Sequence, residues 1–280
     1  MKKILIGALS VLLMFMSNYD LALNVADSTG VVHDNPEDGN GSNAYIIDED
    51  GKRVELIDDF DLSGSVQNLM IHEQLKKVKY DYTQAYNINN DVSGWIYFGD
   101  YVYTPYVDTP HHFDKYFRTD LYGNFDWTGI PFMSQTSLSS FDENALIYGH
   151  NMKNGSGFGN LKHIDTAKNF KEAPYLVLYN GEEDVFHFYK VYSVFNVIDG
   201  VEFINLKNFD NEEQRINYNK SLQARTEFDI EDGWEIDWSR KALFLQHCHE
   251  KYGGVTRRAV GFYNFADLDG HEINIDSFSP

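Results

Sequence analysis

The stretch ALIYGHNMKNGSGFGNL, Ala145–Leu161, decides the fold, because in it a short apolar run gives way to a histidine and a polar, glycine-rich loop. A short apolar run with aromatic and β-branched residues is typical of a buried strand. The glycines and asparagines that follow are typical of a loop. His150 is therefore expected where a buried strand ends. A histidine in that setting is a candidate general acid or base if a reactive group lies across from it.

Further runs of this kind follow Asn90, rich in Val, Ile, Tyr and Phe and separated by Gly, Pro, Asn or Asp. They are GWIYFGD, VYTPYV, GIPFMS, YLVLYN, VFHFYKVYSVFNVI, ALFLQHC and RRAVGFYNF. Many short strands at such spacing predict a mostly β fold with a closed or nearly closed barrel. The segment NGEED, between Tyr179 and Val185, predicts a hairpin turn.

Two helices are expected beside these strands. SVQNLMIHEQLKKVKYDYTQAYNIN has apolar residues at helical spacing, with Ser65 as its N-cap and an end near Asn87. NEEQRINYNKSLQART lies before ALFLQHC, and one face of it offers Ile216, Tyr218 and Leu222. A third and shorter helical candidate is HHFDKYFRTDL.

The N-terminus indicates export. Lys2 and Lys3 precede the uncharged apolar run Ile4–Ser17, a pattern typical of a signal segment. The run is shorter than the roughly 20 residues of a membrane-crossing helix, but no clean cleavage site follows it. Residues 1–26 are therefore expected to be a signal anchor or a signal peptide, with retention in the cell membrane slightly favoured over secretion.

The domain organisation follows from composition. Residues 27–59 are polar and acidic and are expected to form a flexible spacer, within which AYIIDEDGKRVEL forms either a small hairpin or no fixed structure. Residues 60–280 are expected to be one catalytic domain.

The charge and the cysteine count exclude several classes of protein. The net charge is −20, so nucleic acids and anionic membrane surfaces are poor partners. The chain has one cysteine, Cys248, so it cannot form an internal disulfide.

Cys248 ends an apolar run, as His150 does, so both side chains are expected at strand ends on one barrel rim. A thiol becomes a nucleophile when a nearby cation favours its ionised form, and a histidine can then protonate a leaving amine. Arg257 and Arg258 begin the next strand. Because side chains alternate along a strand, only one of the two arginines can face the thiol. A guanidinium there could stabilise a developing oxyanion.

Taken together, DVSGWIYF, FRTDLYGNFDWTGIPFM, ALIYGHNMKNGSGFGNL and LFLQHC followed by RRAV resemble the sortase family, class B in particular. The resemblance runs from Asn90 to about Asn264. It implies a cysteine transpeptidase with Cys248 as the nucleophile and His150 as the catalytic histidine. For the third role we choose Arg257, with Arg258 as a near-even alternative.

The resemblance also implies the reaction and its partners. The enzyme would cleave a sorting motif of secreted proteins and transfer the acyl group to an amine of a cell-wall precursor or a pilin. It would act at the outer face of a Gram-positive cell membrane and would need no cofactor. Asn151, beside the histidine, either contacts the substrate or only forms a turn.

Three other functions are weighed against this one. His247, Cys248 and His249 suggest a zinc site, but on a strand the two histidines point away from the cysteine. A papain-like protease has its cysteine before its histidine, which is the opposite order. The third is a catalytically impaired binding protein of the cell surface. Its support is that Phe244–Cys248 reads FLQHC where sortases usually carry Thr-Leu-x-Thr-Cys.

Overall fold

The computed structural model describes only part of the chain. The described residues are 45–47, 53–55, 62–112, 114–134, 144–198, 202–207, 209–226, 236–248, 256–276 and 278. The predicted signal segment, residues 1–26, and most of the predicted spacer lie outside them. In the spacer, β1 (Tyr45–Ile47) and β2 (Arg53–Glu55) pair antiparallel, which is the hairpin that the sequence left open.

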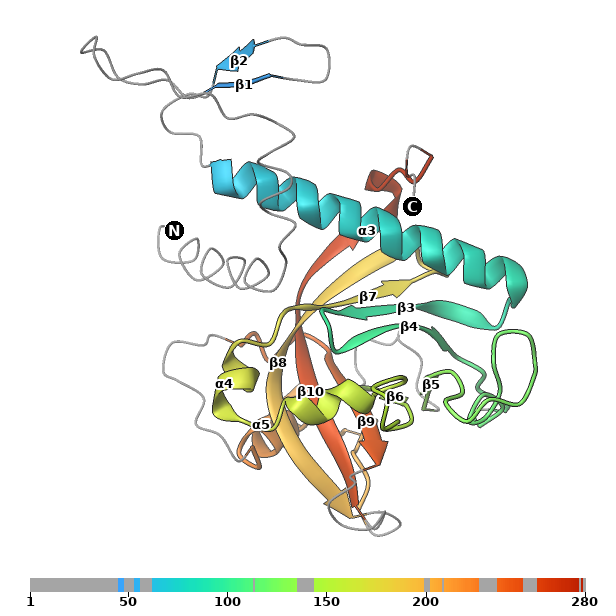
Figure 1. The fold of residues 1–280 in the computed structure, drawn as a ribbon. Coiled ribbons are helices and arrows are strands. Elements are labelled where there is room, and N and C mark those ends of the chain that lie inside the picture. Colours follow the sequence, from blue (N-terminus) through green and yellow to red (C-terminus); the bar gives the residue numbers. More distant parts are fainter. Residues whose placement is uncertain are drawn as a thin grey trace. The chain divides into compact units, whose positions relative to one another are not determined.

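The remaining elements appear in chain order in Figure 1. They are α3 (Leu62–Ile88), β3 (Val92–Phe98), β4 (Val102–Val107), β5 (Phe132–Met133), β6 (Ala145–Tyr148), η3 (Gly159–His163), α4 (Ala167–Lys171), β7 (Leu176–Asn180), β8 (Val185–Ile198), α5 (Glu212–Gln223), β9 (Ala242–Cys248), β10 (Thr256–Asp269) and η5 (Gly270–Glu272). Within the described ranges, no helix has the length and apolar character needed to cross a membrane.

Eight strands close into a barrel in the order β10-β8-β7-β3-β4-β5-β6-β9. Most neighbours are antiparallel, but β4 pairs parallel with β5, and β6 pairs parallel with β9. The turn between β7 and β8 spans residues 181–184, as NGEED predicted, and Asp184 takes a positive φ of 51° there. The expected mostly β barrel, with a helix before it and another before the cysteine strand, is confirmed.

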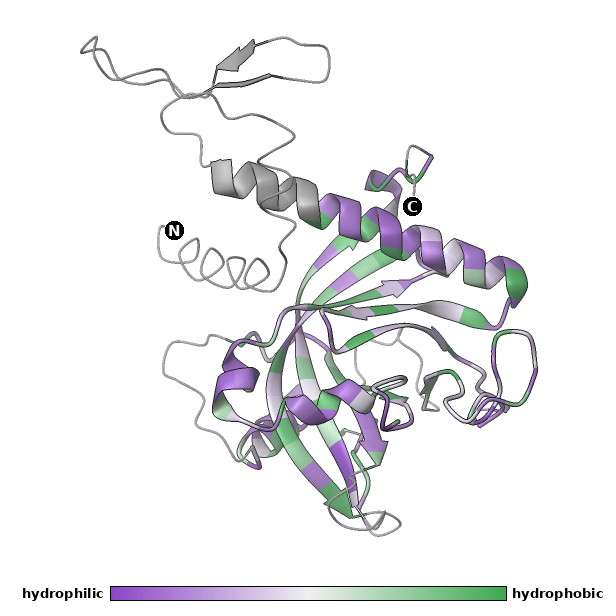
Figure 2. Ribbon diagram, viewed as in Figure 1, coloured by the Kyte–Doolittle hydropathy of each residue, from purple (hydrophilic) through white to green (hydrophobic). Residues whose placement is uncertain are grey.

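Alternate residues of the strands pack into two apolar clusters. The inner cluster draws side chains from all eight strands, Leu243 and Leu245 of β9 among them, and fills the barrel. The outer cluster includes Phe244 and Ala242 and lies between the barrel wall and α5. Hydrophobic and hydrophilic residues are accordingly interspersed along the strands (Figure 2). This alternation fixes which face of β9 each of its side chains occupies.

The helix α3 is mostly hydrophilic in its described part (Figure 2) and buries few side chains. Leu75, Val78 and Ala85 are buried, and Lys79 forms an ion pair with Asp184 of the β7–β8 turn at 2.9 Å. The part of α3 from Leu75 to Ala85 therefore packs against the barrel domain, beside the β7–β8 turn. The end of α3 near Asn87 was predicted to within one residue.

Two local predictions were wrong, and a third was right only in part. Ser65 lies inside α3 and is not its N-cap. The segment HHFDKYFRTDL forms turns rather than a helix. The predicted face of α5 was right for Leu222 and in part for Tyr218, which packs on the outer cluster, but the other fully buried residues are Arg215 and Asn219, and Ile216 is only half-buried.

Polar partners explain the buried face of α5. Arg215 donates to the carbonyl of Ser239 at 2.7 Å, just before β9 begins. Asn219 exchanges two side-chain hydrogen bonds with the fully buried Asn144, at 2.8 and 3.0 Å. Buried polar groups are tolerated when they are hydrogen-bonded, so an apolar pattern cannot reveal this face.

Candidate active site

Three neighbouring strands bring the candidate residues to one end of the barrel. In the parallel pair of β6 and β9, Tyr148 lies opposite Gln246, and the amide of Gly149 donates to the Gln246 carbonyl at 3.0 Å. His150 lies two residues after Tyr148, and Cys248 lies two residues after Gln246. In the antiparallel pair of β9 and β10, Arg257 lies directly opposite Cys248. The three residues therefore come to the same level of adjacent strands.

The strand register decides which arginine faces the thiol. Arg257 pairs with Cys248, and its Nη1 donates to the Cys248 sulfur at 2.7 Å. Arg258 pairs with His247, and both side chains point the other way, into the barrel. The Arg258 side chain is buried, and its Nη2 donates to the carbonyl of Ile164 at 3.4 Å. Of the two arginines, only Arg257 is placed to act on the sulfur.

The thiol of Cys248 is partly exposed, at the end of a strand whose other side chains are buried. The carbonyl of the same residue accepts a hydrogen bond from Asn151 Nδ2 at 2.9 Å. It also lies 2.8 Å from Nδ1 of His247, which donates to it because a carbonyl can only accept. Neighbouring segments thus bind both the side chain and the main chain of Cys248.

The histidine is held by a segment that is distant in the sequence. His150 Nε2 lies 2.8 Å from the carbonyl of Phe117, so Nε2 carries the hydrogen of the neutral ring and Nδ1 is left as the basic nitrogen. The Phe117 ring lies against the imidazole, with 4.3 Å between the ring centroids. Within the described residues, no hydrogen bond joins His150 to Cys248.

Burial lowers the pKa of His150 below its ordinary value, and the positive charges of Arg118 and Arg257 lower it further. The hydrogen bond to the Phe117 carbonyl acts in the opposite direction. Because the ordinary value is 6.5, the imidazole is mostly neutral at neutral pH. A neutral imidazole can accept a proton from a thiol or an amine and then return it.

The loop after β6 is compact because two glycines permit it. A Cβ on Gly149 would lie 2.5 Å from the Phe158 ring, and Gly157 has a φ of +63°, which L side chains rarely adopt. These glycines let the amide of Phe158 donate to the carbonyl of His150 at 2.8 Å. The loop thereby fixes the backbone on both sides of Asn151.

The structure gives no support to a metal site built on the cysteine. His247 and Cys248 point to opposite faces of β9, as expected from strand alternation, and His249 lies outside the described residues. Among the side chains that the structure describes, no three of His, Cys, Asp and Glu are grouped so that they could hold a metal ion.

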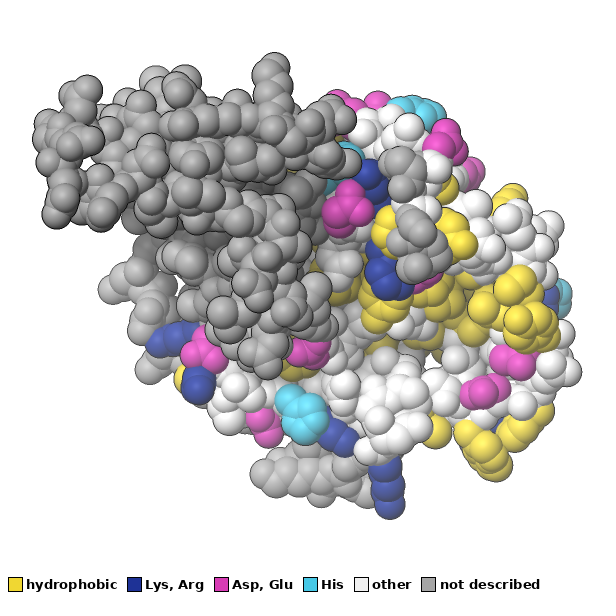
Figure 3. All heavy atoms as spheres, turned by 45° about the horizontal axis from the view of Figure 1, so that its top comes forward, with side chains coloured by type: hydrophobic (Ala, Val, Ile, Leu, Met, Phe, Trp, Pro, Cys, Tyr) yellow, Lys and Arg dark blue, Asp and Glu magenta, His cyan; other side chains and the backbone are white. Residues whose placement is uncertain are grey.

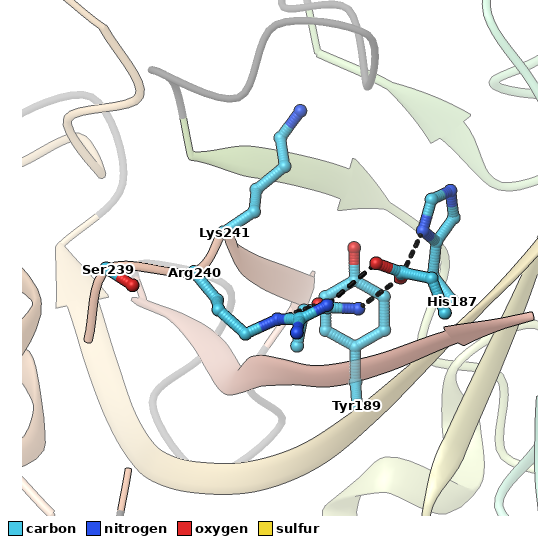
Figure 4. A pocket seen from close by; sticks show the side chains of 7 residues that line it. His187, Tyr189, Ser239, Arg240 and Lys241 are labelled. Carbon is cyan, nitrogen blue, oxygen red and sulfur yellow. Dashed lines mark hydrogen bonds and ion pairs between the residues drawn. The ribbon is translucent and has the colours of Figure 1, made fainter. Parts of the chain in front are cut away.

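A separate pocket of about 220 Å³ lies toward the other end of β10 (Figure 4). None of the three candidate residues lines it. Asp267 accepts hydrogen bonds there from Arg240 at 2.7 Å, from His187 at 2.8 Å and from Asn264 at 2.8 Å. Since these polar groups pair with one another, we assign the cluster to holding β8, β10 and the start of β9 together.

The fold is similar to solved structures of one enzyme family. Sortase B from Clostridium perfringens has a TM-score of 0.58 at 23% identity, over 66% of this chain and 99% of that chain. Sortase B from Staphylococcus aureus, complexed with MTSET, has a TM-score of 0.58 at 17% identity, over 76% and 93% of the two chains. Sortase B from Bacillus anthracis, in complex with AAEK1, has a TM-score of 0.56 at 18% identity, over 71% and 97%.

The chain has a sortase-like fold. No family model matches the sequence, and no curated protein matches it either. The resemblance inferred from the four quoted motifs is therefore confirmed at the level of the fold, by sortase structures of class B.

Sequence reasoning missed Phe117 and Arg118, although both lie in a motif that carries the sortase resemblance. The expected helix there would not have placed a free carbonyl against His150. The signal for turns there was the composition of LYGNFDWTG, whose two glycines, asparagine and aspartate favour turns.

Proposed function

We propose that the chain is a sortase-type cysteine transpeptidase. The observation that carries the proposal is the 2.7 Å hydrogen bond from Arg257 to the Cys248 sulfur at the end of β9. The parallel neighbour of β9 is β6, and His150 lies two residues beyond the end of β6. Charge-assisted hydrogen bonds of this kind stabilise negative charge on the acceptor. A sulfur held by a guanidinium at a strand end, with a neutral imidazole just beyond the end of the neighbouring strand, suits nucleophilic catalysis.

In the proposed first stage, Nδ1 of His150 takes the thiol proton and the Cys248 sulfur attacks a peptide carbonyl carbon. Arg257 donates to the sulfur at first, and then to the oxygen on which negative charge develops. The carbon–nitrogen bond breaks, and His150 gives its proton to the departing amine. A thioester on Cys248 remains.

In the second stage, an acceptor amine attacks the thioester carbon and His150 takes one of its protons. The carbon–sulfur bond breaks, a new amide forms, and the proton returns to the sulfur. The enzyme is thereby restored, with no oxidant or cofactor consumed.

The proposed partners are a sorting motif of a secreted protein and an amine of a cell-wall precursor or a pilin. Solved structures of sortase B include a substrate complex of the Staphylococcus aureus enzyme and a complex with triglycine. We further propose that residues 1–26 export the chain and tether residues 60–280 at the outer face of the cell membrane.

A second candidate function is a sortase-fold binding protein of the cell surface. The observation that favours it is that the His150 ring is bonded to the Phe117 carbonyl and not to Cys248. Catalytic hydrogen bonds often tighten only when substrate binds, so this geometry is compatible with both functions.

The test is to trap the thioester. The full chain is incubated with candidate sorting peptides, and mass spectrometry then locates any adduct. An acyl adduct on Cys248 that is absent from Cys248→Ala, and that added amine releases, is the expected result. If no peptide gives an adduct and iodoacetamide labels Cys248 no faster than a thiol in an unfolded chain, the binding protein is favoured instead.

A further inference from the structure

A cluster of exposed aromatic side chains stands beside the candidate active site. Phe117, Tyr122, Phe125 and Trp127 are 41, 71, 64 and 61% exposed, and Arg118 lies among them. We call these five residues the aromatic surface. Hydrophobic side chains also gather in patches on the face of the molecule drawn in Figure 3. Single exposed apolar residues are ordinary, but four within eleven consecutive positions form a patch, and patches of this kind mark binding sites.

Two rings of the aromatic surface lie against one guanidinium, and a third ring packs on one of them. Arg118 lies 4.6 Å from the centroid of the Trp127 ring and 5.5 Å from that of the Phe117 ring. Phe125 packs edge-on against Trp127, with 5.0 Å between their centroids. Within the described residues, no carboxylate forms an ion pair with Arg118. Stacking on the rings orients the planar guanidinium and leaves its N–H edge for an acceptor.

The backbone beneath the aromatic surface is rigid because two aspartates hold its turns. The Asp120 carboxylate accepts from the amides of Tyr122 and Asn124 at 2.9 and 2.8 Å. The Asp126 carboxylate accepts from the amides of Thr128 and Gly129 at 2.5 and 3.2 Å. A surface that is ordered before binding loses less conformational entropy when it binds.

Phe117 belongs both to the aromatic surface and to the surroundings of the histidine. Its carbonyl accepts from His150 Nε2 and its ring packs on the imidazole. A molecule on the aromatic surface would therefore continue directly into the candidate active site.

We propose that the aromatic surface binds a polypeptide segment of the substrate that carries a carboxylate beside an apolar side chain. The carboxylate accepts from Arg118 in the bidentate manner that guanidinium groups favour. The apolar side chain packs against the paired rings of Phe125 and Trp127. Aromatic side chains and arginine are the types that contribute most to protein interfaces.

Charge argues against two other occupants. The net charge of −20 repels surfaces with many negative charges, such as anionic lipid or nucleic acid. A single carboxylate among apolar groups meets a local positive charge at Arg118 without that repulsion. That the segment belongs to the substrate of Cys248 rests on the proposed function, but the binding chemistry does not.

The test measures binding alone, with no turnover. A fluorescein-labelled peptide Gly-Gly-Glu-Leu-Phe-Glu-Gly-Gly is titrated with the full chain by fluorescence anisotropy, beside peptides with Gln or Lys in place of Glu. We expect the Glu peptide to bind at least about tenfold more tightly than either of the others. Trp127→Ala and Arg118→Gln should each weaken it about thirtyfold or more, the loss typical of an interface hot spot.

Tyr86→Ala is the matched control, because Tyr86 is a 45% exposed aromatic on α3 and should leave binding unchanged. Equal binding of the three peptides, or unchanged binding by Trp127→Ala, overturns the proposal. Binding of a chitin oligosaccharide or self-association, if either is lost in Trp127→Ala while the peptides do not bind, overturns it in favour of that other occupant. A Cys248 adduct without peptide binding overturns the aromatic surface but not the transpeptidase.

Discussion

Cys248 and Arg257 are held by a strand ladder, whereas His150 is held by loops. The ladder between β9 and β10 fixes the arginine opposite the cysteine through consecutive backbone pairs. The histidine, by contrast, follows the end of β6 and rests on Phe117, which lies in a segment of turns. The difference indicates a division of labour, in which the ladder sets the position of the sulfur and the loops set the protonation and the access of the imidazole.

The site has a ladder half, Cys248 and Arg257, and a loop half, His150. The largest effects should come from removing the reactive side chain of Cys248 from the first or of His150 from the second. Cys248→Ala should abolish the acyl adduct, and His150→Ala should abolish turnover. Because His150 takes the thiol proton in the proposed first stage, iodoacetamide should label Cys248 more slowly in His150→Ala than in the wild type at neutral pH. Labelling should still be faster than for a thiol in an unfolded chain, because Arg257 still donates to the sulfur. Complete loss of labelling in His150→Ala would assign activation of the sulfur to the loops and contradict this division.

The two arginines should separate activity from stability. Arg257→Ala should reduce kcat/KM about 100-fold, the cost of losing an oxyanion donor, and change the Tm little. Arg258→Ala leaves a cavity inside the barrel and should lower the unfolding free energy by roughly 2 kcal/mol. Peptide turnover and thermal unfolding measure the two quantities. Full activity in Arg257→Ala would remove the arginine from the mechanism.

A smaller effect on catalysis is expected from Asn151, whose side chain joins the loop after β6 to Cys248 of β9. Asn151→Ala removes the donor to the Cys248 carbonyl without adding a charge beside the sulfur. We expect kcat to fall about tenfold or less, since one hydrogen bond contributes roughly 1 kcal/mol, while KM changes little. A loss confined to KM would mean that Asn151 contacts the substrate and does not position the cysteine.

The smallest effect is on the titration of the histidine. Arg118 lowers the pKa of His150 through its positive charge, so Arg118→Gln should raise that pKa toward its ordinary value. The protonated imidazole should then persist to higher pH. Proton NMR of the His150 ring, titrated in both proteins, gives the difference directly. If the pKa of His150 stays the same or falls in Arg118→Gln, the charge of Arg118 does not act on the imidazole.

The ladder half of the site could be predicted because its signals are local. An apolar run that ends in Cys248, and one that ends before His150, place both residues at strand ends. Alternation along a strand also requires that only one arginine of the pair face the sulfur. Which arginine does so depends on the register between β9 and β10, and two adjacent arginines do not determine a register.

The loop half could not be predicted because its contacts join segments that share no pattern. The carbonyl of Phe117 belongs to the main chain, which every residue has. The residue type at position 117 therefore cannot predict that this carbonyl binds the imidazole. The buried face of α5 was in part misassigned for a related reason, since Arg215 and Asn219 are buried through their partners and not through their own polarity.

The parallel pairing of β6 with β9 has a consequence for how the protein matures. These strands are far apart in the sequence, and β7, β8 and α5 are all made between them. Pairing of such distant segments is slow, because the chain must lose the entropy of closing a long loop before any stabilising contact between the strands can form. The imidazole and the thiol therefore come to neighbouring strands only when β6 and β9 pair. A chain that has not yet formed this pair would carry a cysteine without its proposed general base, so full reactivity would begin only after this late step of folding.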